Sequence, residues 1–328
     1  MEGLDILLIM SSPGEKFPEE MRDEPFLVFE RADGERFHRL WYITTRARKA
    51  GEYSVFTVIA KNFSTIMESC EPAGYNFKIA SYLDNLSGAF ILENPAIEHE
   101  KGHVWKKPLW KELHPLEICL FLSRLVYPTA TNLKYASRCI IQGNQLVRVM
   151  PARYYGWLTE AYLPVSQAKI LGRRTWYTAE EISTLGKILG NFLERELPER
   201  LQRSLWSYVY GFSSDDLTVR WHFIAQAFQS MACINDYCVR QQFLHRIPKI
   251  AKDIGIELES KEVEKIWGYR NTVDHGRLIV KATEKELGLL EKAEEVIAKV
   301  IKQAFLDEKF ALRWENEESL QKCFPVII

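Results

Sequence analysis

The chain has 328 residues, enough for two domains. Hydrophobic residues make up 47% and charged residues 27%, which is ordinary for a globular protein. The net charge is -1, and residues 1–200 and 201–328 are each close to neutral, which argues against a basic domain that forms a broad nucleic-acid platform but leaves room for a local basic cleft.

The sequence also carries signals about where the protein works. No charged segment precedes a small-residue cleavage site, and no apolar run approaches the roughly 20 residues of a membrane span. The six cysteines form no C-x-x-C pair, which argues against zinc or thioredoxin-like chemistry. We therefore expect a cytoplasmic protein with free thiols, without a metal or cofactor and without membrane contact.

The first 110 residues show the patterns of β-strands. Asp33-Gly34 separates two such runs and is a good hairpin turn. The predicted strands are residues 4–10, 25–30, 36–44, 53–60, 77–83 and 89–92. An antiparallel sheet is the simplest architecture for them.

A buried helix and a second hairpin are expected next. The helix begins after His114-Pro115 with the apolar run 116–122 and ends near Pro128. The hairpin joins residues 135–141 and 145–150 around Gly143-Asn144. We therefore predict that residues 1–177 form a mainly antiparallel β domain, which would serve as a sensing or substrate-binding module.

After Tyr177 the spacing of apolar residues becomes helical. Residues 178–181 and 283–286 are capping boxes, in which side chains satisfy free backbone N–H groups at a helix start. The predicted helices are 178–196, one with an apolar stripe over 217–228, 237–254, 260–269 and 283–305. We read 178–312 as all-α and place a helical bundle at residues 178–328, which makes the whole chain an α+β protein.

One stretch, residues 267–276, combines groups suited to phosphodiester chemistry. Arg270 stays charged, His275 titrates near neutral pH, and Asn271 adds a neutral donor and acceptor. Arg270 and His275 are five residues apart, so they are about 140° apart around a helix. A bend, or the loss of helix at Gly276, would bring both side chains towards one rim.

Residues 270–276 resemble the signature of the HEPN superfamily, which has an Arg, a polar residue, a few further residues, a His and frequently a Gly. An aromatic residue, Tyr269, precedes the Arg, and in this respect the motif resembles the Apea-like branch found in bacterial defence proteins. Asp274 departs from the pattern, because an apolar residue is common there. The resemblance covers roughly residues 200–312, and the motif falls at the end of a helix, where the family places it.

The resemblance implies a metal-independent endoribonuclease that acts as an effector in phage defence or in a toxin system. Two protomers would pair through the helical domain, so that both motifs line one cleft around the RNA substrate. His275 would act as base or acid, Arg270 would clamp the phosphate and Asn271 would orient it. Arg220 and Tyr269 would contact the substrate. The products would carry a 2′,3′-cyclic phosphate and a 5′-hydroxyl.

Readings without catalysis stay open. Arg270 could cap a carbonyl or pair with Asp274, and His275 could simply end a helix, since helix C-termini favour His and Gly. The alternative functions are a non-catalytic HEPN-like dimerisation or interaction protein and a nucleotide-binding regulator that uses Arg270 for phosphate.

Other candidate residues have simpler explanations. Asp215-Asp216 reads as a helix N-cap, and His222 as a partly exposed helical histidine. His99 and His103 have the four-residue spacing of a metal pair but lie in a polar segment without a nearby third ligand. Residues 105–111 mix Lys and Trp, a composition found at single-strand binding sites and on ordinary surfaces.

Overall fold

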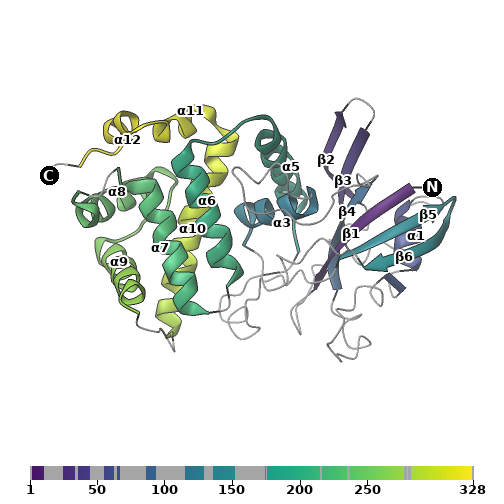
Figure 1. The fold of residues 1–328 in the computed structure, drawn as a ribbon, viewed down its shortest axis with the longest axis horizontal. Coiled ribbons are helices and arrows are strands. Elements are labelled where there is room, and N and C mark those ends of the chain that lie inside the picture. The colour runs from purple at the N-terminus through teal and green to yellow at the C-terminus, as the bar shows by residue number, and fades with distance from the viewer. Residues whose placement is uncertain are drawn as a thin grey trace. The chain divides into compact units, whose positions relative to one another are not determined.

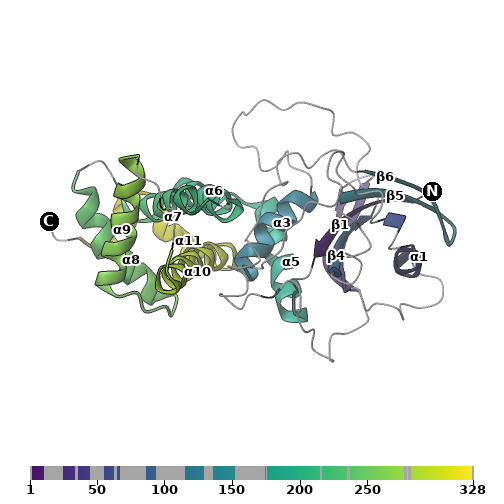
Figure 2. The same cartoon turned by 90° about the horizontal axis from the view of Figure 1, so that it is seen from below.

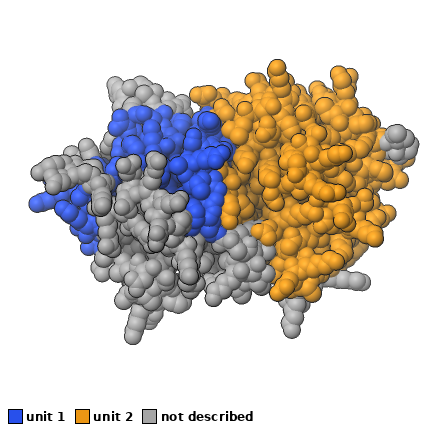
Figure 3. Space-filling view, turned by 180° about the vertical axis from the view of Figure 1, so that it is seen from behind, with its two compact units in different colours: residues 1–123, 129–161, 173–190 blue, residues 124–128, 162–172, 191–328 orange. Residues whose placement is uncertain are grey.

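The computed structural model describes residues 2–10, 25–33, 36–44, 55–62, 65–66, 86–93, 115–128, 136–151, 174, 176–214, 216–234, 237–276, 279 and 282–326. The chain divides into two compact units, one of residues 1–123, 129–161 and 173–190 and one of residues 124–128, 162–172 and 191–328 (Figure 3). An N-terminal antiparallel sheet is followed by a series of helices (Figure 1), which confirms the predicted α+β class. The predicted domain boundary at residues 177 and 178 stays a prediction.

The strands of the first unit form one antiparallel sheet. Their bounds are β1 (Glu2–Met10), β2 (Phe26–Asp33), β3 (Arg36–Thr44), β4 (Leu86–Glu93), β5 (Ala136–Gln142) and β6 (Gln145–Pro151). In the described part of the chain the order is β2-β3-β4-β1-β5-β6. Both predicted hairpins are confirmed and lie at the two edges of the sheet. Gly143 in the second turn has φ +58°, a conformation that glycine adopts without steric cost.

The strand predicted for residues 53–60 is wrong, because residues 55–61 form the helix α1 (Val55–Lys61). A short apolar run fits a strand or a helix equally well, and tertiary packing decides between them. Phe56 and Ile59, three apart on α1, are buried against a core that the sheet provides. That core includes Leu4, Ile6, Ile43, Ala89, Ile91, Cys139 and Ile141. The strand predicted for residues 77–83 lies outside the described residues.

In this unit the sheet lies between α1 and the early parts of two further helices, α3 (Pro115–Val126) and α5 (Ala179–Glu194), as Figures 1 and 2 show. The buried helix predicted after His114-Pro115 is therefore confirmed as α3. The Tyr177 hydroxyl donates to Ser123 of α3 at 2.9 Å, and the Tyr42 hydroxyl of β3 accepts from the Tyr177 N–H at 3.3 Å. Gly186 brings α5 close to β2, since a Cβ at this position would lie 1.9 Å from the Val28 carbonyl oxygen.

The described helices of the second unit are α6 (Glu199–Ser213), α7 (Leu217–Ala232), α8 (Val239–Asp253), α9 (Ser260–Asp274), α10 (Glu284–Leu306), α11 (Glu308–Ala311) and α12 (Glu317–Cys323). Side chains cap several of these helices, among them α7, α10, α11 and α12. Both predicted capping boxes, at Thr178 and Thr283, are confirmed. Asp216 caps α7 by accepting from the N–H groups of Thr218 and Val219. Helices α6, α11 and α12 were not predicted individually.

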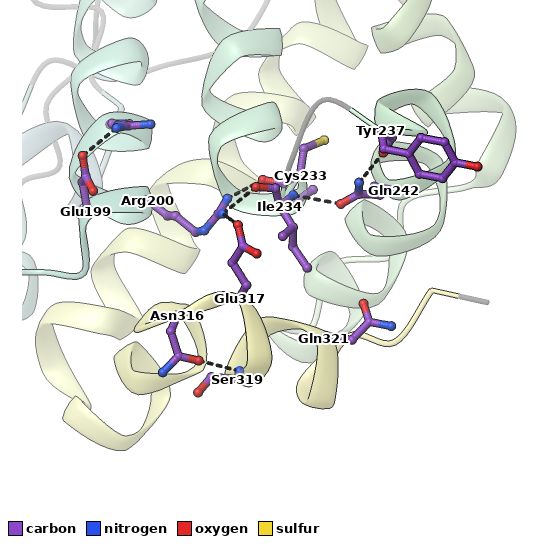
Figure 4. Close-up of polar contacts among 12 residues, drawn as sticks. Glu199, Arg200, Cys233, Ile234, Tyr237, Gln242, Asn316, Glu317, Ser319 and Gln321 are labelled. Carbon is purple, nitrogen blue, oxygen red and sulfur yellow. Dashed lines mark hydrogen bonds and ion pairs between the residues drawn. The ribbon is translucent and has the colours of Figure 1, made fainter. Parts of the chain in front are cut away.

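Helices α6 and α7 run side by side, with α10 packed against both and α9 against α7 (Figures 1 and 2). The C-terminal segment is fastened to the end of α7 by polar contacts. Arg200 of α6 donates to the carbonyl oxygens of Cys233 and Ile234 and pairs with Glu317 of α12 at 3.5 Å (Figure 4). Among the described helices, none combines the length and hydropathy that a membrane span needs.

Candidate functional site

The motif of residues 267–276 forms the C-terminal part of α9 and the turn after it. The helix continues beyond the predicted end at Tyr269 to Asp274, and His275 is its C-cap. The Gly276 N–H donates to the Val273 carbonyl at 2.8 Å, and Gly276 adopts φ +70°, which glycine takes up readily at the end of a helix. Because the helix bends only after His275, Arg270 and His275 keep their helical separation of about 140°.

Arg270 is half-buried and directed back along α9. Its guanidinium lies 4.7 Å from the centre of the Trp267 ring, and its Nε donates to Gln229 of α7 at 3.3 Å. Its Nη1 donates to the side-chain oxygen of Asn271 at 3.2 Å. The structure thus brings Arg270 and Asn271 together beside α7. The side chain of Asp274, the alternative partner of Arg270, lies outside the described residues.

His275 is exposed and stands apart from the Arg270 guanidinium. The Asn271 carbonyl accepts from the His275 N–H at 3.1 Å, but the His275 ring makes no hydrogen bond to any residue that the structure describes. Trp267, on which the guanidinium rests, precedes His275 by eight residues, or about 12 Å of helix axis. Within one chain, therefore, the structure does not bring the guanidinium and the imidazole to one point.

Tyr269 fastens α9 to its neighbours. Its ring stacks on Trp221 of α7 with centroids 4.3 Å apart, and its hydroxyl donates to Glu286 of α10 at 2.6 Å. Burial, together with the bond to Glu286, raises the pKa of the Tyr269 hydroxyl. Hydrogen bonds from the Thr283 N–H and the Tyr269 hydroxyl lower the pKa of Glu286. The hydroxyl predicted to contact substrate is thus engaged in the junction of α9 and α10.

Arg220 lies inside the bundle. Its exposed fraction is 1%, and its Nε donates to the buried carboxylate of Glu294 on α10 at 2.5 Å. Its guanidinium also lies 5.1 Å from the centre of the Phe212 ring. This placement favours a stabilising role for Arg220 over the predicted contact with substrate.

Residues that the sequence did not single out complete the surroundings of the motif. Gln229 carries no sequence signal, because a polar residue on an exposed helix face is ordinary. Glu286 was noted only as part of a capping box, yet it also binds Tyr269. His222 is half-buried, and its Nε2 is hydrogen-bonded to Gln226 at 2.9 Å.

The remaining sequence candidates yield no second site. In the described part of the chain, no group of three or more His, Cys, Asp or Glu side chains is arranged to hold a metal ion. Asp216 acts as a helix cap. His99, His103, residues 105–111 and Asp215 lie outside the described residues.

The motif offers three kinds of chemistry on one helix end. Arg270 and Asn271 supply donors that suit phosphate oxygens, and His275 supplies an exposed imidazole. In a single chain the Arg270 guanidinium and the His275 imidazole are separated along the helix axis.

Comparisons of the chain with protein-family models, with curated proteins and with solved structures found no match.

Proposed function

We propose that this chain is a metal-independent endoribonuclease of the HEPN type, acting as an effector in phage defence or in a toxin system. The observation that carries the proposal is an exposed His275 at the end of the helix that also presents the Arg270–Asn271 pair. The resemblance of residues 270–276 to the HEPN signature supports the reaction class, and the biological setting rests on that resemblance alone.

The reaction needs few groups, because RNA carries its own nucleophile. His275 of one protomer removes the proton of the 2′-hydroxyl, whose oxygen attacks the adjacent phosphorus. Arg270 stabilises the charge that builds on the phosphoryl oxygens. The bond to the 5′-oxygen breaks, and a second imidazole protonates that leaving oxygen. The products are a 2′,3′-cyclic phosphate and a 5′-hydroxyl.

A homodimer supplies the second imidazole. The contact would lie over residues 217–233 and 266–277. In a two-fold pair the same surface faces itself, and with the axis perpendicular to α9 the two α9 helices would run antiparallel across the contact. With the axis midway between Trp267 and His275, the Arg270 guanidinium of each protomer would lie level with His275 of the other. Pairing would thus close the axial gap that the single chain leaves open.

Incubating the purified full chain with RNA in EDTA tests the proposal directly. We expect cleavage that leaves 2′,3′-cyclic phosphate ends, read by mass spectrometry of the fragments. Intact RNA at micromolar protein would contradict a ribonuclease.

A second candidate is a non-catalytic helical interaction module. It is favoured by the contacts that Tyr269, Arg220 and Arg270 make inside the bundle, since such contacts serve stability without any substrate. Intact RNA together with a tight dimer in sedimentation analysis would support this alternative.

A further inference from the structure

Two cysteines stand at the junction of α7 and α8. Cys233 is the C-cap residue of α7, and Cys238 is the N-cap residue of α8. Both thiols are free. The Cys233 thiol donates to the Val239 carbonyl oxygen at 3.6 Å, so its sulfur faces the first residue of α8, the neighbour of Cys238.

A single side chain holds the two ends of the segment between these cysteines. The amide of Gln242 on α8 accepts from the Ile234 N–H at 2.8 Å and donates to the Tyr237 carbonyl at 2.7 Å (Figure 4). Ile234 directly follows Cys233, and Tyr237 directly precedes Cys238. The two cysteines therefore flank a short segment whose ends are fastened to the same helix.

Cys238 has an unusual backbone conformation. Its φ of +50° and ψ of 36° are left-handed, and among the described residues other than glycine it is the only one with a positive φ. This conformation is unfavourable for a residue with a Cβ. The Cys238 side chain makes no capping hydrogen bond to α8. Neither backbone preference nor helix capping thus accounts for a cysteine at this position.

The junction is connected to the motif through one turn of α7. The Cys233 N–H donates to the Gln229 carbonyl at 2.9 Å, and the Gln229 side chain accepts from Arg270 of α9 at 3.3 Å. A movement of the last turn of α7 would therefore move a hydrogen-bond partner of the Arg270 guanidinium.

We propose that Cys233 and Cys238 form a reversible disulfide, with a peroxide as the oxidant, and that this bond regulates the Arg270 site. The regulatory part rests on the proposed ribonuclease function. In the reduced chain Gln229 accepts from Arg270. In the oxidised chain the Cys233 sulfur leaves the Val239 carbonyl for Cys238, the last turn of α7 shifts, and Arg270 loses the contact with Gln229.

The oxidation takes place in two steps. Cys238 is half-buried and lies outside the dimer contact proposed above, so peroxide reaches it first. Its thiolate attacks one peroxide oxygen, the O–O bond breaks, water leaves, and Cys238 becomes a sulfenic acid. The Cys233 sulfur then attacks the Cys238 sulfur, and the Cys233 proton leaves with the displaced hydroxide as a second water. The two thiols lose two electrons in total, and one hydrogen peroxide molecule gains them.

Cys233 is suited to the second step rather than the first. Burial raises the pKa of its thiol to about 12, although the charges of Arg246, Arg200 and Arg270 oppose that rise. A protonated thiol reacts slowly with peroxide from solution. Attack on a sulfenic acid in the same chain benefits from the proximity of the two groups.

The test treats the reduced full chain with hydrogen peroxide and blocks the remaining thiols with iodoacetamide. Trypsin leaves both cysteines in one peptide, residues 221–240, and a further cut before Asp236 separates them. We expect mass spectrometry to find the two fragments linked until dithiothreitol is added. Cys238→Ser should give no linked fragments. Cys323→Ser is the matched control, because it removes an exposed thiol on α12 and should leave the linkage unchanged.

Hydrogen exchange and cleavage measure the effect on the site. We expect faster exchange in residues 226–233 and 267–272 of the oxidised wild type, and no difference between treated and untreated Cys238→Ser. The oxidised wild type should cut RNA in EDTA about tenfold more slowly, the scale of one hydrogen bond to a charged group, and dithiothreitol should restore the rate. If circular dichroism shows that Cys238→Ser is unfolded, Cys233→Ala gives the same comparison.

The other outcomes overturn the proposal or separate it from the ribonuclease. Absence of linked fragments overturns the disulfide, as does a linkage of either cysteine to Cys323. Linked fragments with equal exchange and equal cutting in both states retain the ribonuclease and reject the regulation. Exchange that changes with the disulfide, in a chain that cuts no RNA in either state, retains the redox pair and rejects the ribonuclease.

Discussion

Among the predicted site residues, His275 is the one whose substitution is expected to change catalysis without disturbing the packing of the helices. It is exposed at a helix C-cap, so truncating it removes little buried surface. Tyr269 and Arg270, by contrast, contact neighbours on other helices. A loss of activity at His275 can therefore be read as chemistry, whereas a loss at the other two positions needs a check of the fold.

We expect His275→Ala to lower RNA cleavage about 100-fold or more, because general acid–base groups contribute on that scale. Its melting temperature should stay at the wild-type value. His245→Ala on α8 is the matched control, since His245 is also exposed. Rate measurements on both variants, with melting curves, check the prediction. Normal turnover by His275→Ala would remove His275 from the mechanism.

The Tyr269–Glu286 contact predicts a dependence of stability on pH. The folded state lowers the pKa of Glu286 below its usual value of about 4.3, chiefly through the Thr283 N–H. This contribution is therefore complete at neutral pH and is lost as pH falls through the folded-state pKa. We expect Glu286→Gln to reduce the free energy of unfolding at pH 7 and to cost less below pH 4.

Denaturant titrations at the two pH values measure this difference. Glu284→Gln is the control, because Glu284 lies in the same first turn of α10 and is exposed. Glu284→Gln removes the same negative charge near the helix N-terminus, so it accounts for the loss of the favourable interaction with the helix dipole. An equal cost of Glu286→Gln at pH 7 and below pH 4 would show that the carboxylate contributes nothing through these bonds.

At the scale of elements, α7 positions the motif by contacting α9 along its length. Trp221 receives the Tyr269 ring, Gln229 receives Arg270, and the Thr218 hydroxyl accepts from the Ile279 N–H at 2.9 Å. The buried pair of Arg220 and Glu294 then joins α7 to α10. The orientation of α9 consequently depends on the α7–α10 packing as well as on its own sequence.

Breaking the buried pair should be costly. Glu294→Ala leaves the Arg220 guanidinium buried without its partner, and we expect a loss of about 3–5 kcal/mol in the free energy of unfolding. Glu295→Ala is the control on the same helix, because the Glu295–Lys299 pair is 46% and 39% exposed and should contribute below about 1 kcal/mol. Chemical denaturation measures both variants, and similar losses would contradict the burial argument.

The double variant Arg220→Met, Glu294→Leu separates stability from substrate binding. Replacing a buried ion pair with packed apolar side chains is often neutral, so we expect recovery of most of the lost stability. If Arg220 serves only packing, the double variant cuts RNA at the wild-type rate. A stable double variant with raised KM would instead support the predicted substrate contact.

At the scale of the whole molecule, the proposed chemistry depends on assembly. One chain presents the Arg270 guanidinium and the His275 imidazole at different heights along α9. A two-fold pair contains two copies of each group in one cleft. The proposed activity should therefore disappear when the protein is diluted below its dimer dissociation constant.

Mixing two inactive variants tests the shared site. A heterodimer of His275→Ala with Arg270→Ala retains one Arg270 and one His275, so we expect partial activity above that of either parent. Mixed samples are compared with each parent at equal total protein concentration. Full cutting by a protein that sedimentation shows to be monomeric would refute the shared site, as would a dimer with the two His275 residues on opposite outer faces.

Local sequence signals determined much of the fold. The hairpin of β2 and β3, the turn at Gly143-Asn144, the capping boxes at Thr178 and Thr283, and the apolar stripe of α7 all appear where they were predicted. Each depends on residues only a few positions apart. The strand prediction for residues 53–60 was wrong because the apolar pattern fits both the strand period and the helix period. Packing against the sheet makes residues 55–61 a helix.

Only the tertiary structure decided the surroundings of the site. The partner of Arg220 is Glu294, 74 residues away, and that of Arg270 is Gln229, 41 residues away. The strand order likewise sets β1 between β4 and β5, which lie far along the chain. Sequence alone places an arginine on a helix, but whether it faces a carboxylate, a ring or solvent depends on distant elements packed against it, because burial and pairing arise only when the chain folds.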